Sequence, residues 1–219
     1  MQKIQGLAHI ERTRVISIVR GITGIQLDML AQTLLEAHMP VMEVTLNSPD
    51  ALASISMLQQ RYGERMYIGA GTVIDVEDAE RALEAGASFL VTPNTDEDVI
   101  HLAASRDVPI FPGAMTPTEI VRCWKAGATA VKIFPSASIG ISYMKELQGP
   151  LSHIPMIAVG GVNEANIAEF LTAGCYAVGI GGYIADKQAL ETGDTASILR
   201  KAKTLLARVE QWRSNHTKQ

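Results

Sequence analysis

The sequence predicts a single (β/α)8 barrel with a short N-terminal helix, and three observations favour it. Eight short β-type runs alternate with helical stretches along the whole chain. The centres of these runs are about 20–26 residues apart, the length of one strand-plus-helix unit with short loops. The chain has no linker or low-complexity segment, so we expect one domain over residues 1–219. Such alternation implies parallel strands with helical crossovers, and eight units favour closure over an open sheet.

The expected strands are short, apolar and bounded by turn residues. They cover residues 15–19, 41–45, 67–70, 89–92, 110–112, 130–134, 156–159 and 177–180. Expected helices include residues 26–37, 76–85, 96–105, 116–126 and 164–173. The spelling Ala-Gly recurs where helix gives way to strand, at Gly86, Gly127 and Gly174, and each glycine is expected to be a left-handed C-cap.

Both ends of the chain are predicted to be helical. Residues before Arg14 are expected to form a leading helix that closes the bottom of the barrel. Residues 194–212 read as a final amphipathic helix, with Asp194 or Thr195 as its N-cap.

Composition excludes several classes of function. The 219 residues carry a net charge of −4 and no Lys/Arg-rich run, which argues against a nucleic-acid partner. No apolar run approaches the roughly 18 residues of a membrane span, and the N-terminus does not resemble a signal peptide. Two cysteines, Cys123 and Cys175, fit a reducing cytoplasm. None of the five histidines has metal-ligand spacing, so no metal is expected.

Two charged residues interrupt apolar strands. Lys132 lies in the expected strand 130–134, and Glu43 lies in the expected strand 41–45. Lysine is rarely buried unless it is paired or functional, and burial lowers its pKa because desolvation disfavours the ammonium. A neutral amine in a dry pocket attacks carbonyl carbons, as Schiff-base lysines do. A buried carboxylate in the same fold suggests an acid–base partner for that chemistry.

Polar residues collect at the C-terminal ends of the expected strands, where barrels carry their chemistry. Arg20 follows the first strand, Asn47 the second and Thr72 the third. Strand alternation places Lys132 with residues 130 and 134, and Glu43 with residues 41 and 45. If those faces point inward, both side chains enter the barrel lumen.

Paired glycines follow the last two strands. They are Gly160-Gly161 and Gly181-Gly182, in the loops that bind phosphate in many barrels through backbone N–H groups. Asn163 is expected to cap the next helix and aim its N-terminus at the anion.

Each of these residues also has a structural explanation. Lys132 can be a buried ion-pair partner of Glu43, although such pairs stabilise poorly. Arg20 can form a salt bridge at the rim, and Thr72 can cap a helix. Pro93 and Pro135 can shape loops, and the glycine pairs can serve tight turns.

The chain resembles the 2-keto-3-deoxy-phosphogluconate / phosphogalactonate aldolase family over most of its length. The order and spacing of seven segments together carry this resemblance. They are IVRG at 18–21, EVTL at 43–46, IGAGTV at 68–73, VTPN at 91–94, FPG at 111–113, VKIFP at 131–135 and VGGV at 159–162.

The resemblance implies a class I aldolase without metal or other cofactor. Lys132 would align with the Schiff-base lysine, and Glu43 with the general acid/base. Thr72 would bind the pyruvate carboxylate, while Pro93 and Phe134 would line the pyruvate pocket. The phosphate-binding loops would contain Gly160, Gly161, Gly181 and Gly182. The family's usual assembly is a homotrimer, which is therefore expected here.

Three departures bear on the substrate. Gluconate-type members have Arg where this chain has Asn47, and Arg20 can supply that cation, as in the galactonate-type branch. Val159 replaces the Thr of gluconate-type members and matches galactonate-type members. Tyr183 stands where a phosphate-binding Ser is common, which leaves the phosphate contact open.

The implied reaction cleaves a 2-keto-3-deoxy-6-phospho sugar acid, of galactonate or gluconate type, to pyruvate and glyceraldehyde 3-phosphate. One alternative is a 4-hydroxy-2-oxoglutarate aldolase that releases glyoxylate and pyruvate. Another is a non-catalytic barrel that binds a sugar phosphate as a sensor. The sequence leaves the C4 stereochemistry of the substrate open.

Overall fold

The computed structural model describes residues 3–216 and has a parallel nine-stranded sheet at its centre. The order of the strands is β5-β4-β3-β2-β1-β9-β8-β7-β6. The strands are β1 (Val15–Val19), β2 (Val41–Thr45), β3 (Tyr67–Gly71), β4 (Leu90–Val91), β5 (Ile110–Phe111), β6 (Gly113–Ala114), β7 (Val131–Ile133), β8 (Met156–Val159) and β9 (Ala177–Ile180). All the observed pairings are parallel, which confirms the predicted barrel class.

The predicted fifth strand is split in two at Pro112. β5 pairs with β4, whereas β6 pairs with β7, so the barrel closes through this short segment. Proline has no backbone N–H and therefore interrupts a strand ladder. Its carbonyl still accepts a hydrogen bond from the Lys132 amide at 2.8 Å, which ties the interruption to β7.

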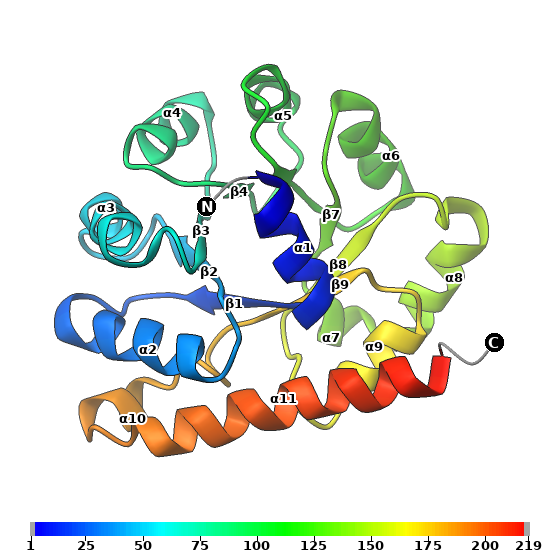
Figure 1. The fold of residues 1–219 in the computed structure, drawn as a ribbon. Helices are drawn as coiled ribbons and strands as arrows, with labels where there is room; N and C mark the ends of the chain where they lie inside the picture. The colour runs from blue at the N-terminus through cyan, green and yellow to red at the C-terminus, as the bar shows by residue number, and fades with distance from the viewer. Residues whose placement is uncertain (1–2, 217–219) are drawn as a thin grey trace.

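A ring of helices surrounds the strands (Figure 1). The helices are α2 (Gly24–Glu36), α3 (Ala51–Tyr62), α4 (Val76–Glu84), α5 (Glu97–Ser105), α6 (Pro117–Ala126), α7 (Ser136–Ile139), α8 (Ile141–Leu151), α9 (Ile167–Thr172) and α10 (Lys187–Glu191). The recurrent glycines at 86, 127 and 174 all have positive φ, as the predicted caps require, and Gly127 is the left-handed C-cap of α6.

The expectation for Asn163 was wrong. Its Oδ1 accepts a hydrogen bond from the Ala165 amide at 2.9 Å, while its own amide donates to Asn166 Oδ1. These local bonds hold a turn, so α9 begins only at Ile167 and has Asn166 as its N-cap. Asn163 therefore does not aim a helix terminus at an anion.

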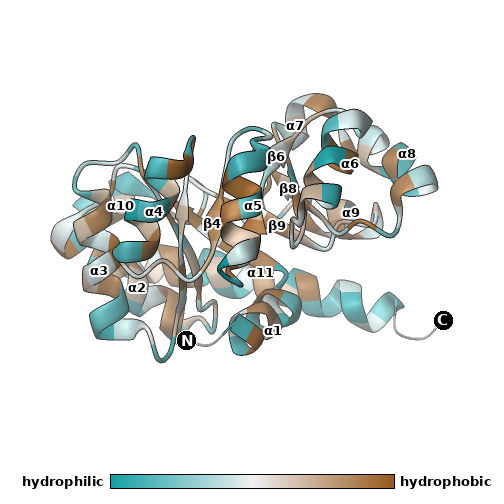
Figure 2. Ribbon diagram, turned by 90° about the horizontal axis from the view of Figure 1, so that it is seen from above, coloured by the Kyte–Doolittle hydropathy of each residue, from teal (hydrophilic) through white to brown (hydrophobic). Residues whose placement is uncertain are grey.

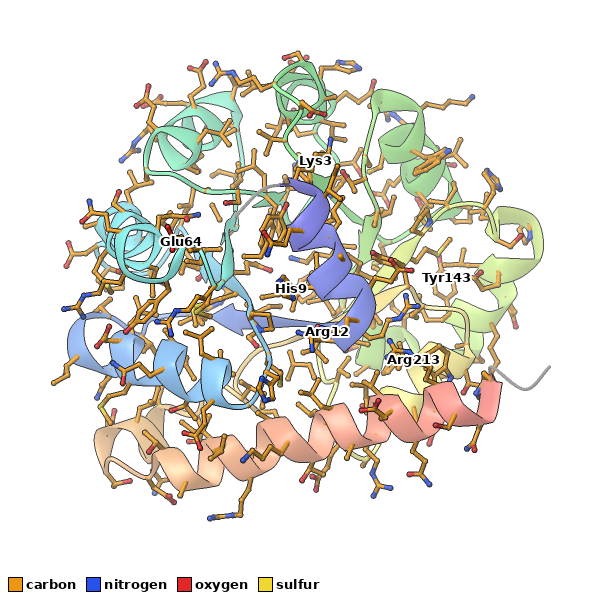
Figure 3. All side chains as sticks on the ribbon, in the orientation of Figure 1. Lys3, His9, Arg12, Glu64, Tyr143 and Arg213 are labelled. Carbon is orange, nitrogen blue, oxygen red and sulfur yellow. The ribbon has the colours of Figure 1, made fainter. Side chains whose placement is uncertain are left out.

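The helix α1 (Lys3–Thr13) lies across the N-terminal end of the barrel (Figure 1), as predicted. Ile10 and Leu7 pack into the lumen, and a Cβ on Gly6 would overlap the ring of Tyr67. The final helix α11 (Thr195–His216) holds α1 in place, since Arg213 donates to the carbonyls of Glu11 and Arg12 at 3.0 and 2.9 Å (Figure 3).

Side chains fill the inside of the barrel near the N-terminal ends of the strands. Phe89 lies between Tyr67 and Phe111 in tilted ring contacts, with centroids 4.8 and 5.6 Å apart, and Ile16 and Ile157 belong to the same cluster. The larger core lies between the strands and the helices. Figure 2 shows α1 and α7 on opposite sides of the molecule, so the helix that closes the barrel lies away from the end where functional side chains are expected.

Candidate active site

Lys132 and Glu43 lie inside the barrel, each at the middle of its strand. Only 7% of Lys132 and 3% of Glu43 are exposed. Val41, on β2, and Ala130, two residues before Lys132, belong to the buried apolar cluster inside the barrel, which agrees with the inward face expected from alternation. Both side chains line one small internal cavity, here the inner cavity. It is lined by Ile16, Glu43, Val91, Phe111, Lys132, Ile157, Val159 and Gly179.

Burial moves the two ionisable groups toward their neutral forms. Desolvation lowers the pKa of Lys132, and the nearby positive charge of Arg20 lowers it further, while Glu43 opposes the shift. Desolvation raises the pKa of Glu43, against the opposing effects of Lys132 and Arg20. A larger share of neutral amine at neutral pH is the condition for attack on a carbonyl.

The two groups do not form a close ion pair. Within residues 3–216, no nitrogen–oxygen contact of 4.0 Å or less joins Lys132 to Glu43. The explanation of Lys132 as a structural ion-pair partner therefore has no support in the geometry. Both side chains line the inner cavity, whose volume of about 10 Å³ is comparable to the space that a single water molecule needs.

A Gly at position 71 makes room for the Glu43 carboxylate. A Cβ added to Gly71, the last residue of β3, would overlap Glu43 Oε1. Any side chain at this position must move the carboxylate. The sequence motif at 68–73 contained this glycine, but nothing in its spelling indicated what it accommodates.

A larger cavity of about 590 Å³, here the mouth cavity, opens at the C-terminal ends of the strands. Val159 and Gly179 line both cavities, so the two are adjacent. Other predicted residues that line the mouth cavity are Arg20, Phe134, Gly160, Gly161, Gly181 and Gly182. Phe134 is 43% exposed there, and the Lys132 Nζ lies 5.2 Å from the centroid of its ring.

Three predicted residues do not line either cavity. Asn47 is exposed in the turn after β2, and Pro93 is exposed in the loop after β4. Thr72 is partly buried and has a φ of 58°. A β-branched residue is strained in this left-handed region, and such strain often marks functional sites. Thr72 does not cap α4, because the N-cap of that helix is Asp75, which accepts from the Asp78 amide at 2.8 Å.

Two buried serines that sequence reasoning missed join the strand ends. Ser48 accepts a hydrogen bond from the Gly21 amide at 2.7 Å and contacts Thr45 Oγ1 at 3.0 Å, so it links the loops after β1 and β2. Ser136 donates to the Ile133 carbonyl and accepts from the Val159 amide at 3.1 Å. Loop serines carry no periodic signal, so only the folded geometry identifies their contacts.

Residues 3–216 contain no arrangement typical of a metal centre, a membrane span or a disulfide. No group of three or more His, Cys, Asp or Glu side chains is arranged to hold a metal ion. No helix in this range is long and apolar enough to cross a membrane. Cys123 and Cys175 are both buried and form no disulfide.

A parallel barrel with a buried lysine and a buried carboxylate on one cavity is an arrangement suited to an enzyme that acts on carbonyl compounds. Residues 8–201 match the family model described as KDPG and KHG aldolase. The chain belongs to that family, whose members are lyases that cleave carbon–carbon bonds.

Curated relatives agree with this assignment. The 2-dehydro-3-deoxy-6-phosphogalactonate aldolase of Escherichia coli K12 is 37% identical over 191 residues, covering 86% of this chain and 93% of that protein. The 2-dehydro-3-deoxy-phosphogluconate aldolase of Treponema pallidum is 31% identical over 190 residues, covering 86% and 90%.

Solved structures give the same result. A structure described as native KDPGal has a TM-score of 0.85 and 33% identity, and covers 91% of this chain and 96% of that one. The KDPG aldolase from Legionella pneumophila has a TM-score of 0.82 and 27% identity, covering 90% and 96%. That structure holds pyruvate as a covalent carbinolamine intermediate.

Proposed function

We propose that this enzyme is a class I aldolase in which Lys132 forms the Schiff base and Glu43 is the general acid/base. The substrate is a 2-keto-3-deoxy-6-phospho sugar acid, which is cleaved to pyruvate and glyceraldehyde 3-phosphate. The observation that carries the proposal is the placement of a buried amine and a buried carboxylate on one inner cavity, adjacent to an open mouth with a cation and paired glycines. No cofactor is required by this chemistry.

The steps follow from the protonation states of the two groups. The neutral Lys132 amine attacks C2 of the substrate, and the resulting carbinolamine takes up a proton from solvent and loses water to give a protonated imine. Glu43, as a carboxylate, takes the proton of the C4 hydroxyl, directly or through a water molecule. The C3–C4 bond breaks, its electrons form an enamine with the imine carbon, and the aldehyde departs. The Glu43 carboxylic acid then protonates C3, and water releases pyruvate from Lys132.

The remaining predicted residues have binding roles in this proposal. Arg20 and Thr72 anchor the substrate carboxylate, and Phe134, Pro93 and Val159 contact the pyruvate carbons. Asn47 recognises substrate oxygens at the rim. The paired glycines bind the phosphate through backbone N–H groups. Only Arg20, Phe134, Val159 and the glycines line a cavity of the described residues, so the roles of the other three depend on the family resemblance.

The galactonate-type substrate has the better support. Asn47 and Val159 follow that branch, and the 37% identical relative bears the phosphogalactonate name. A coupled assay on both C4 epimers and on 4-hydroxy-2-oxoglutarate tests this. We expect the highest kcat/KM with the galactonate epimer. A preference for 4-hydroxy-2-oxoglutarate would identify the alternative aldolase, and binding without turnover of any of them would identify a sensor.

The charges around Lys132 predict opposite shifts in the pH dependence of imine formation. The rate of pyruvate trapping by cyanoborohydride should fall as pH drops below the pKa of Lys132, because the ammonium cannot attack. Glu43→Gln removes a negative charge that raises this pKa, so the falling limb moves to lower pH. Arg20→Met removes a positive charge that lowers it, so the limb moves to higher pH. Shifts in the same direction would contradict this placement of charges.

The proposal also covers the oligomeric state and the cellular location of the enzyme. We infer a cytoplasmic homotrimer, without nucleic-acid or membrane partners. Exposed apolar side chains at Ile74, Met115 and Trp124 offer surface for association. A protein cage designed from symmetric oligomeric domains contains a chain with a TM-score of 0.86 and 33% identity to this one, covering 93% of this chain and 74% of that one. The mass of the particle in solution tests the trimer.

A further inference from the structure

The side chain that follows the second glycine pair does not reach the mouth cavity. Tyr183 stands where a hydroxyl for phosphate is common in the family, yet it is not among the residues that line the cavity. Burial, followed by its interaction with the Glu164 carboxylate, raises the pKa of Tyr183 to about 12. The Lys201 Nζ lies 5.4 Å from the centroid of its ring. The Tyr183 side chain therefore contacts Lys201 on α11 and Glu164 in the loop before α9.

A lysine takes up that side of the cavity instead. Lys187, the first residue of α10, lines the mouth cavity together with Gly181 and Gly182. Its amine lies over the loop after β1. A Cβ added to Gly21 in that loop would be only 2.8 Å from Lys187 Nζ. Gly21 has a φ of +65° and follows Arg20, so two cations border the same opening.

The charge of Lys187 is not neutralised by its neighbours. Among residues 3–216, no ion pair is formed by Lys187. The adjacent carboxylate, Asp186, accepts from Lys201 Nζ at 2.7 Å and from the Ala189 amide at 3.1 Å. The hydrogen bond from Lys201, followed by that from Ala189, lowers the pKa of Asp186, which keeps it ionised and paired. The Lys187 ammonium is therefore available to bind an anion in the mouth cavity.

The two cations act at different depths. The positive charge of Arg20 acts on the pKa values of both Lys132 and Glu43, so Arg20 lies close to the reacting groups. Lys187 begins α10, and its amine lies over Gly21, beyond the end of β1. A substrate held by C2 at Lys132 carries its phosphate at the far end of its chain, toward the outer cation.

We propose that Lys187 is the cationic contact for the distal phosphate and sets the preference for phosphorylated over unphosphorylated 2-keto acids. The inference rests on the proposed function for the identity of the substrate. The glycine backbone supplies N–H donors and the ammonium supplies a point charge in the same cavity, which suits a phosphate dianion.

Lys187→Met tests this role, with Lys203→Met as the matched control. Lys203 is exposed on α11 and does not line the mouth cavity. We expect the KM for the phosphorylated substrate to rise roughly tenfold in Lys187→Met, since a hydrogen bond between two charged groups is strong but is weakened by solvent screening at an open cavity. Its kcat/KM for the dephosphorylated sugar acid should match that of the wild type. Lys187→Arg should restore most of the loss.

The outcomes separate this inference from the proposed function. An unchanged KM for the phosphorylated substrate, or an equal loss with both substrates, overturns the role of Lys187. Trapping of pyruvate on Lys132 by borohydride is measured in the same variants and should proceed at the wild-type level. Failure of that trapping in the wild-type enzyme would refute the Schiff-base proposal instead.

Discussion

Lys132→Met should abolish retro-aldol cleavage and eliminate the mass adduct that borohydride forms with pyruvate on the wild-type enzyme. Methionine nearly matches lysine in length and fits an apolar lumen, so the fold should survive the loss of a buried amine. The reaction has no other route in the proposed mechanism, since every step passes through the bond between Lys132 and C2. Cleavage rates measured together with intact-protein mass spectra after trapping test the prediction.

The control for this variant is Lys145→Met, an exposed lysine on α8. It should keep both cleavage and labelling at the wild-type level. Peptide mapping of the trapped wild-type enzyme should place the added mass on Lys132 alone. A wild-type enzyme that remains unlabelled and fully active after treatment with pyruvate and borohydride would remove the basis of the mechanism.

Glu43→Gln should lower kcat by roughly 10²–10⁴-fold, the usual contribution of general acid–base catalysis. Glutamine keeps the shape of glutamate but cannot take the C4 hydroxyl proton or return one to C3. The variant should still form the imine, because the lysine and its cavity remain. Steady-state cleavage together with the extent of pyruvate trapping separates loss of proton transfer from loss of the nucleophile.

A second variant checks that the position of the carboxylate matters as well as its charge. Gly71→Ala keeps Glu43 but places a Cβ where its Oε1 lies, so kcat should fall while trapping persists. Gly149→Ala is the matched control, since a Cβ there meets no atom within 4 Å. A Glu43→Gln enzyme with wild-type kcat would show that another group moves the protons.

The sequence predicted the features that depend on periodicity. Strand alternation correctly placed Lys132 and Glu43 in the lumen, because one face of each strand must point inward in a closed barrel. The paired glycines were expected at the ends of the last two strands, and they line the mouth cavity there. These signals are local, so they can be read without coordinates.

Features that depend on contacts between loops far apart in the chain could not be predicted from the sequence. Lys187 and Gly21 are far apart in sequence, and only the pairing of β1 with β9 brings their loops together. The prediction for Asn163 was wrong because an asparagine side chain can either cap a helix or hold the turn before it, and the local sequence does not distinguish the two. Pro112 lies in an otherwise strand-like run, and its missing N–H shortened both strands around it.

Under the proposed mechanism, the position of helix α1 implies a fixed order in which the products leave. With Ile10 and Leu7 seated in the lower lumen, the reacting centre exchanges molecules with solvent through the opposite end. In the proposed mechanism, the glyceraldehyde 3-phosphate fragment occupies that exit, while the pyruvate fragment stays attached to Lys132 below it. The aldehyde must therefore leave before the water that hydrolyses the imine can enter, and in the synthetic direction pyruvate must bind first.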